Sequence, residues 1–434
     1  MPLPTLKLAR IAAVCLCLAV GAASAYGEPA IRKLEGKHLT LLTDVPASPE
    51  VDELVHVFDA AVALWCERFK QPIESHAAWR VRGYLMQSRE RFAAAGHIPE
   101  RLPDFPNGFS WNDQIWLYDQ PSAYYRRHLL LHEGTHSFMN AALGSVGPPW
   151  YAEGMAELLA THRWQDGTLT LAYFPRERRE VPMLNRIQMI QRDSRAGRTL
   201  SLPEVIAFDK RAHLRNETYG WCWGAAVFLD SHPQYRQDFR ALANEVRTGN
   251  FTRAAEQLLS QHGQELADEW QIFICNVDYG YDFERMAVRF APGKALLSGG
   301  TQVEVAADHG WQSSGVALQA GRTYRLRAAG RYQIVAKPRV WWCEPGGVTI
   351  AYYHGMPLGM LQAVVQPQDR KPPQPSVFQA PLAVGLDHAL TPDVSGTLYL
   401  RINDAAGRLA DNKGSVTVSI QEEMGERREA RDGR

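Results

Sequence analysis

The spacing of apolar residues changes near residue 290, and this change strongly limits the folds open to the chain. Upstream, short strand-like apolar runs alternate with longer amphipathic runs, and helical runs then dominate. Downstream of Pro292, short alternating runs such as 321–336 and 396–404 are separated by glycine and proline. Such runs are typical of an antiparallel β-sandwich. The sequence therefore predicts an α+β chain with a mixed N-terminal part followed by a C-terminal sandwich.

The upstream part is expected to combine a small sheet with several helices. Strands are predicted over 37–45 and 80–87, and a hairpin over 107–119 turns at Asn112-Asp113. Ser201 and Glu204 form a capping-box pattern that predicts the start of another helix. An amphipathic helix is predicted over 49–70, and further helical runs cover 122–143, 151–163, 217–230, 234–247 and 252–276.

The first 25 residues have the pattern of a secretory signal peptide. Lys7 and Arg10 precede an apolar run over 11–22, and the run ends in Ala23-Ser24-Ala25. This run is too short to remain as a membrane-spanning helix, and no later segment is apolar enough to span. We therefore expect cleavage after Ala25 and a secreted or periplasmic protein.

The composition limits the classes of partner that the protein is expected to bind. The chain has 47 Lys+Arg and 47 Asp+Glu, so its formal net charge is zero and no nucleic acid partner is expected. Four of the six cysteines lie beyond the signal pattern. Export permits disulfides, and four cysteines allow three pairings between which the sequence does not choose.

The stretch LLLHEGTHSFMN (129–140) carries three titratable groups in an otherwise apolar helical run. His132, Glu133 and His136 form the pattern H-E-x-x-H, which places both histidines on one helix face within reach of a single ion. Glu133 is placed to take a proton from a water that the metal activates. The alternative is two hydrogen-bonded core histidines and a surface glutamate. Burying these groups without a partner costs several kcal/mol, and a cation would offset that cost.

A third metal ligand must come from outside this stretch. His128 lies about 12 Å along the helix from His136, so the three histidines cannot share one ion. The segment 148–160, PPWYAEGMAELLA, follows a proline break and predicts a second helix. This helix carries Glu153 near its start and Glu157 one turn later.

H-E-x-x-H followed by W-x-x-E-G-x-A resembles the gluzincin metallopeptidases, the broad class of thermolysin and the zinc aminopeptidases. The resemblance implies that Glu153 is the third Zn²⁺ ligand and that Glu157 orients a histidine ligand. Residues 218–229, TYGWCWGAAVFL, resemble a helix of the same class, which implies that Tyr219 donates a hydrogen bond to the oxyanion. A solvated helix face for the glutamates and a packing role for the tyrosine remain the alternatives.

The resemblance implies an exported, zinc-dependent peptidase over 26–288. The chain lacks the glycine-rich recognition motif of the aminopeptidases, so we expect an endopeptidase acting on a protein or peptide substrate. The hairpin 107–119 stands where the class has an edge strand that can pair with an extended peptide. The chain departs from the class at Gly134, which costs about 1 kcal/mol of helix propensity.

The C-terminal part carries a loop rich in side-chain oxygens between two predicted strands, within 396–420. Clustered oxygen ligands in a short loop suit Ca²⁺, although a turn without an ion is the alternative. The stretch resembles the bacterial galactophilic calcium lectins. That resemblance implies three side-chain ligands and one backbone carbonyl ligand, from Asp404, Asp411 and Asn412 and from Arg408 respectively.

The lectin-like domain is predicted over 291–421, followed by a disordered charged tail over 422–434. Residues 344–348 replace the sugar loop of those lectins. A second function therefore stays open: a carbohydrate-binding or adhesion protein that contacts cell-surface glycoconjugates and has an inactive peptidase-like domain. An intact Glu133 beside both histidines favours the enzyme.

Overall fold

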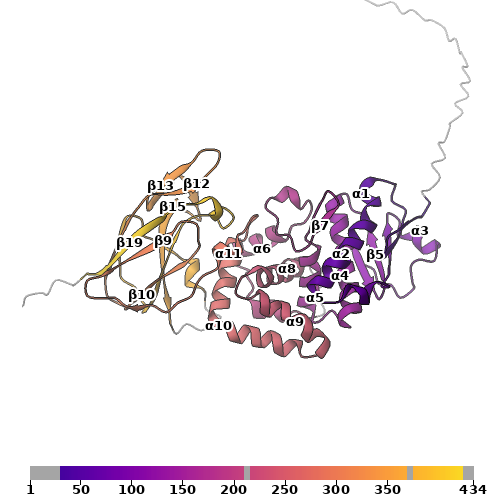
Figure 1. Cartoon of the computed structure of the whole chain (residues 1–434), viewed down its shortest axis with the longest axis horizontal. Coiled ribbons are helices and arrows are strands. Elements are labelled where there is room, and N and C mark those ends of the chain that lie inside the picture. The colour runs from indigo at the N-terminus through magenta and orange to yellow at the C-terminus, as the bar shows by residue number, and fades with distance from the viewer. Residues whose placement is uncertain (1–29, 210–215, 369–374, 424–434) are drawn as a thin grey trace, which may run out of the picture.

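The computed structural model describes residues 30–209, 216–368 and 375–423 in two adjoining parts (Figure 1). The N-terminal part combines helices with a small sheet, and the part after about residue 290 consists almost entirely of strands. The predicted α+β class is confirmed. The predicted signal peptide lies outside the described residues, as does the tail from 424 onward. Strand β19 includes Glu422, the first residue of the predicted tail.

The N-terminal sheet has five strands in the order β1-β2-β3-β5-β4. The three inner strands run parallel, and both edge strands pair antiparallel to their neighbours. The predicted hairpin is confirmed, and Asn112 adopts φ 54° at its turn, which asparagine tolerates better than most residues. The strands are β1 (Arg32–Glu35), β2 (Leu39–Thr43), β3 (Val81–Met86), β4 (Gly108–Trp111) and β5 (Gln114–Tyr118).

Helices pack against this sheet and extend toward the second part. The capping box of Ser201 and Glu204 opens α7 as predicted. The predicted helix 49–70 is divided at Glu53, and the predicted helix 252–276 is kinked at Gly263, where φ is 48°. The helices are α1 (Pro49–Asp52), α2 (Leu54–Arg68), α3 (Arg89–Ala94), α4 (Ala123–Leu143), α5 (Pro149–Ala160), α6 (Arg186–Arg195), α7 (Leu202–Ile206), α8 (Asn216–Ser231), α9 (Arg236–Thr248), α10 (Phe251–Asn276) and α11 (Phe283–Met286).

The helix that carries H-E-x-x-H is buried by close packing on both sides. Ser122 caps α4 by accepting from the Tyr125 backbone amide, and Gly144 ends it with φ 77°. A Cβ at Gly134 would lie 2.7 Å from Phe58 and 2.8 Å from Trp65 of α2. The glycine that departs from the gluzincin pattern is therefore needed for the close approach of α2 and α4.

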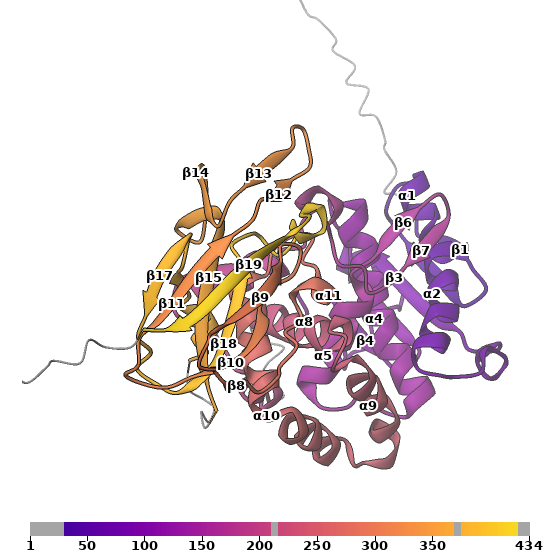
Figure 2. The ribbon, with the colours of Figure 1, turned by 60° about the vertical axis from the view of Figure 1, so that its left-hand side comes forward.

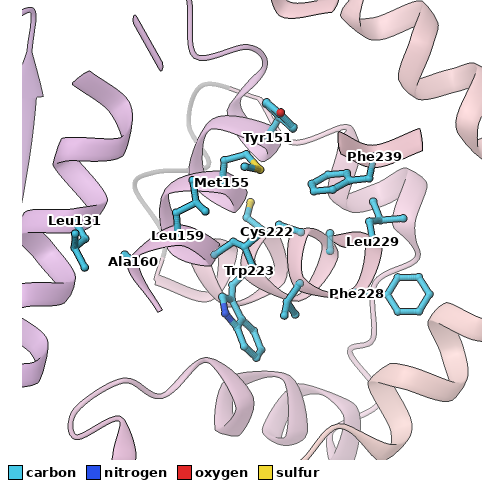
Figure 3. Close-up of a cluster of buried hydrophobic side chains, with 14 of the residues drawn as sticks. Leu131, Tyr151, Met155, Leu159, Ala160, Cys222, Trp223, Phe228, Leu229 and Phe239 are labelled. Carbon is cyan, nitrogen blue, oxygen red and sulfur yellow. The ribbon is translucent and has the colours of Figure 1, made fainter. Parts of the chain in front are cut away.

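Helix α5 packs on α8 through an apolar cluster. Figure 3 shows Met155 and Leu159 of α5 close to Cys222 and Trp223 of α8, and all four side chains are almost completely buried. Burying a large apolar side chain contributes roughly 1.5–3 kcal/mol. This packing fixes α5, and with it Glu153 and Glu157, relative to the rest of the N-terminal part.

The C-terminal part contains two main sheets that enclose a second apolar core. One follows the order β14-β15-β18-β10-β8, with β16 beside β15, and the other follows β17-β11-β19-β9. The pairing is antiparallel as predicted, except between β8 and β10. The strands are β8 (Lys294–Ala295), β9 (Thr301–Ala306), β10 (Gln312–Leu318), β11 (Tyr324–Ala329), β12 (Tyr332–Val335), β13 (Trp341–Cys343), β14 (Gly346–Tyr353), β15 (Met356–Pro367), β16 (Leu382–Ala383), β17 (Asp387–Leu390), β18 (Gly396–Ile402) and β19 (Ser415–Glu422).

The two parts meet along α10 and α11 (Figure 2), and apolar side chains are buried along this seam. Trp311, Phe378 and Tyr399 of the C-terminal part belong to the same apolar cluster as the helices. Polar contacts cross the seam as well, including Gln366 Nε2 to Asp268 Oδ2 at 3.0 Å. The main core therefore extends across the predicted domain boundary.

Two further expectations concern membranes and disulfides. Among the described residues, no helix has both the length and the apolar character needed to cross a membrane. The cysteines Cys66, Cys222, Cys275 and Cys343 are all free thiols, so none of the three possible pairings is formed.

Candidate metal centre

Helices α4 and α5 bring the predicted metal ligands together. His132 and His136 lie one turn apart on α4, and Glu153 projects from the first half of α5. Nε2 of His132 lies 3.3 Å from Nε2 of His136 and 3.3 Å from Oε2 of Glu153. Nε2 of His136 lies 3.6 Å from the same oxygen. The three atoms form a nearly equilateral triangle.

The spacing of this triangle is compatible with a tetrahedral metal ion. Ligands about 2.0–2.1 Å from a tetrahedral zinc ion are about 3.3–3.4 Å from one another. Oε2 of Glu153 is buried, and among the described residues no donor is aligned to form a hydrogen bond with it. A buried acceptor without a donor is costly, and a cation between the three atoms would remove that cost. Two imidazoles and one carboxylate therefore fit a metal ion.

The pKa shifts of Glu153 and His132 also favour a positive charge between the three ligand atoms. Burial alone would raise the pKa of Glu153, but His136 and His132 outweigh it and lower that pKa far below its usual range. Burial would lower the pKa of His132, but the carboxylates of Glu153 and Glu157 raise it to about 10. A metal ion would replace the proton that the cluster otherwise attracts.

A second group, formed by His128, His132 and Glu157, also has metal-like spacing. Here the carboxylate is already satisfied, because Arg186 donates to both of its oxygens, at 2.9 and 2.6 Å. Nε2 of His128 lies 3.3 Å from Oε2 of Glu157. His128 is therefore not part of the triangle formed by His132, His136 and Glu153. Neither group contains all three histidines, and the unsatisfied oxygen of Glu153 makes the triangle the better candidate for a metal ion.

The predicted base lies next to the edge strand of the sheet. A Cβ at Gly108 of β4 would approach Oε1 of Glu133 to 2.9 Å, so the strand backbone runs directly beside the carboxylate. Glu133 is 7% exposed. Its position between the histidines and an edge strand suits a group that must meet both water and an extended peptide.

Tyr219 approaches the centre from α8. Its ring centroid lies 6.1 Å from that of His132. Burial raises the pKa of its phenol, and the carboxylates of Glu153 and Glu157 raise it further. The hydroxyl therefore stays protonated at neutral pH and remains a hydrogen-bond donor.

Two other tyrosines, Tyr279 and Tyr281, follow α10 and are alternative candidates for the oxyanion donor. The Tyr279 hydroxyl accepts a hydrogen bond from Gln188 of α6. Tyr281 packs against Phe273 and Phe283 in the core. Of these three tyrosines, Tyr219 is the one whose ring lies beside His132.

The predicted calcium loop folds into a buried polar cluster. Asn412 Nδ2 donates to Asp404 Oδ2 at 3.0 Å. Asp411 Oδ1 and Asn412 Oδ1 are buried acceptors without a donor among the described residues. The Arg408 carbonyl, predicted as a backbone ligand, accepts from the Asp411 amide at 3.3 Å. Burial raises the pKa of Asp404 to about 6. Unsatisfied buried oxygens beside a carboxylate fit a hard cation such as Ca²⁺.

The sequence alone does not show that His128 and Arg186 contact Glu157 at the centre. Helical periodicity places His128 on the same helix face as His132, but its contact with Glu157 depends on how α5 packs. Arg186 left no local signal, because it lies 29 residues from Glu157 in the chain and begins a helix, α6, that was not predicted.

No protein-family model matches this chain, and no curated protein matches it. Among solved structures, the chain is similar to one titled "EclA N-terminal domain; PllA-like lectin", with 23% sequence identity and a TM-score of 0.21. The match covers 28% of this chain and 95% of that chain. A TM-score this low does not establish a shared fold. The resemblance to calcium lectins therefore stays a prediction from the residues, and so does the zincin-like fold.

Proposed function

We propose that the chain is an exported zinc-dependent endopeptidase. The observation that carries the proposal is the buried Oε2 of Glu153, which has no aligned donor and lies 3.3 and 3.6 Å from the two imidazole nitrogens. His132, His136 and Glu153 would hold the metal. When bound, Zn²⁺ acts as a Lewis acid that polarises the substrate carbonyl and lowers the pKa of water.

The remaining steps belong to side chains of this chain. The Glu133 carboxylate takes a proton from the attacking water and gives it to the leaving amine. The Tyr219 hydroxyl donates a hydrogen bond to the developing oxyanion. The edge strand β4 binds the substrate as an added antiparallel strand through backbone hydrogen bonds, which hold the scissile bond beside Glu133.

Glu133→Gln tests the proposal. We expect the variant to retain about one zinc per chain and the melting temperature of the wild type, while turnover of casein falls by several orders of magnitude, because only the base is lost. Glu256→Gln, at an exposed position of α10, serves as the matched control and should retain full activity. A wild-type protein without zinc, or with activity unaffected by Glu133→Gln, would contradict the proposal.

Export rests on the signal pattern before Ala25. Protein recovered from the medium or periplasm should begin at Tyr26, as determined by N-terminal sequencing. Retention of Lys7 and Arg10 in the recovered protein would exclude cleavage at this position.

The loop around Asp404 favours a second candidate function, calcium-dependent carbohydrate binding with an inactive peptidase-like domain. The buried oxygens of Asp411 and Asn412 that lack donors are the observation behind it. Binding to a glycan array with and without calcium tests this function, and casein turnover separates it from the first. Glycan binding without turnover would favour the second function over the first.

A further inference from the structure

Arg186 pairs with Glu157 through two nitrogens of its guanidinium. Nε donates to Oε2 at 2.9 Å and Nη2 donates to Oε1 at 2.6 Å. The pair is almost completely buried, with side-chain exposures of 12% and 2%. Two parallel charge-assisted hydrogen bonds fix the plane of a carboxylate as well as its position.

The carboxylate fixed in this way faces two imidazoles. Oε1 of Glu157 lies 3.4 Å from Nδ1 of His132, and Oε2 lies 3.3 Å from Nε2 of His128. A proton on Nδ1 of His132 directed at Glu157 leaves the lone pair of Nε2 for a metal ion. The orientation of Glu157 therefore determines which nitrogen of His132 can bind metal.

The same guanidinium contacts the predicted oxyanion donor. Its central carbon lies 5.6 Å from the ring centroid of Tyr219, within the range of a cation–π interaction. Arg186 thus lies between Glu157 and Tyr219, which are supplied by α5 and α8. One side chain from α6 links both elements at the centre.

Charge gives a further reason for a cation here. Glu133, Glu153 and Glu157 place three carboxylates around one buried point, and repulsion between them would oppose folding. A divalent metal together with Arg186 balances these charges. Arg186 is part of the protein and so supplies its charge whether or not metal is bound.

We propose that Arg186 is a positioning residue of the metal centre. It fixes Glu157, so that His132 presents Nε2 to the metal, and it holds the ring of Tyr219 against the same centre. This inference rests on the proposed zinc-dependent function.

Arg186→Lys and Arg186→Met test the inference in the full chain. Lysine keeps the charge but cannot make two parallel bonds, and methionine keeps only an apolar stem. We expect the zinc affinity of Arg186→Lys, from competition with a chromophoric chelator, to fall about 10–100-fold. The visible absorption spectrum of the cobalt-substituted variant should also change, because His132 is no longer fixed. With excess zinc, kcat should fall while KM changes little.

Arg240→Lys is the matched control. Arg240 also makes two bonds to a buried carboxylate, Asp230, at 2.8 and 3.1 Å, but Asp230 contacts no histidine of the centre. This variant should lose thermal stability while its zinc affinity and cobalt spectrum stay those of the wild type. The comparison separates loss of an ion pair with a buried carboxylate from loss of metal positioning.

The results separate failure of the proposed role of Arg186 from failure of the proposed zinc-dependent function. If the wild type binds neither zinc nor cobalt, the proposed function fails and the inference fails with it. If the wild type binds both, and folded Arg186→Lys binds them with unchanged affinity and spectrum, Arg186 is an ordinary structural ion pair and only the inference is overturned. Circular dichroism establishes folding, and Arg186→Lys decides the question if Arg186→Met does not fold.

Discussion

Glu157 Oε1 lies 3.4 Å from Nδ1 of His132, while Glu153 Oε2 lies 3.3 Å from the other ring nitrogen, Nε2. One imidazole is therefore held between two carboxylates that have different partners. Glu157 is bound by Arg186, whereas Glu153 has no aligned donor. Under the proposed function, this difference makes Glu157 the orienting carboxylate and Glu153 the metal ligand.

The two glutamates should consequently respond differently to substitution. Glu153→Ala should remove the bound zinc, as His132→Ala and His136→Ala should, because each deletes one of three ligands. Glu157→Ala should retain zinc with affinity reduced about 10–100-fold. Elemental analysis after dialysis measures both effects. Zinc lost from Glu157→Ala but retained by Glu153→Ala would reverse the ligand assignment.

Tyr219→Phe tests the oxyanion donor. The change deletes only the hydroxyl, so zinc content and melting temperature should be unchanged. Loss of one oxyanion donor typically costs about 2.7–4 kcal/mol, so kcat should fall on the order of a hundredfold with KM nearly constant. Tyr279→Phe is the control, because its hydroxyl is engaged by Gln188. Full activity in Tyr219→Phe together with loss in Tyr279→Phe would transfer the role to Tyr279.

Calcium should stabilise the C-terminal part through the loop around Asp404. A ligand present at 100 times its Kd stabilises the folded state by about 2.7 kcal/mol, which is visible as a rise in melting temperature. Asp404→Ala should abolish the rise, whereas Asp393→Ala, at an exposed position of the same part, should retain it. A wild-type melting temperature that is independent of calcium would refute the site.

Stability should depend on pH through Asp230, which lies outside the metal centre. Burial would raise its pKa, but Arg240 and Arg68 outweigh burial and lower it. A lowered carboxyl pKa stabilises the fold above the unfolded value of about 3.9, and this stabilisation is lost as pH falls toward the folded value. Asp230→Asn should therefore destabilise the protein at pH 7, by about 3 kcal/mol, and progressively less below pH ~4.

Thermal unfolding of both proteins between pH 3 and 8 measures this difference. Asp52→Asn is the control, because Asp52 forms an exposed pair with Arg32 and should cost less than about 1 kcal/mol. A difference between wild type and Asp230→Asn that stays constant across the pH range would contradict the assignment.

The features that the sequence predicted are those with local physical causes. The hairpin at Asn112 follows from turn chemistry, and the shared face of His132 and His136 follows from helical periodicity. The proximity of Glu153 could be predicted only through the gluzincin resemblance, because it depends on how α4 and α5 pack.

The features that the sequence did not predict depend on distant parts of the chain. Arg186 meets Glu157 across 29 residues, and α6 itself is short and rich in arginine. The local sequence also gives no reason for Gly134, because the side chains that exclude a larger residue there are Phe58 and Trp65 of α2. Tertiary packing, and not helix propensity, determined that position.

The seam between the two parts affects whether fragments of the protein can be produced separately. Gly407 fits so tightly that a Cβ would lie 2.7 Å from the Tyr279 carbonyl oxygen, and Trp311, Phe378 and Tyr399 complete the apolar cluster. A break in the connection near Pro292 would leave these surfaces bare on both fragments. We expect separately produced fragments to aggregate, and co-expressed fragments to reassemble as a split protein that purifies as one species.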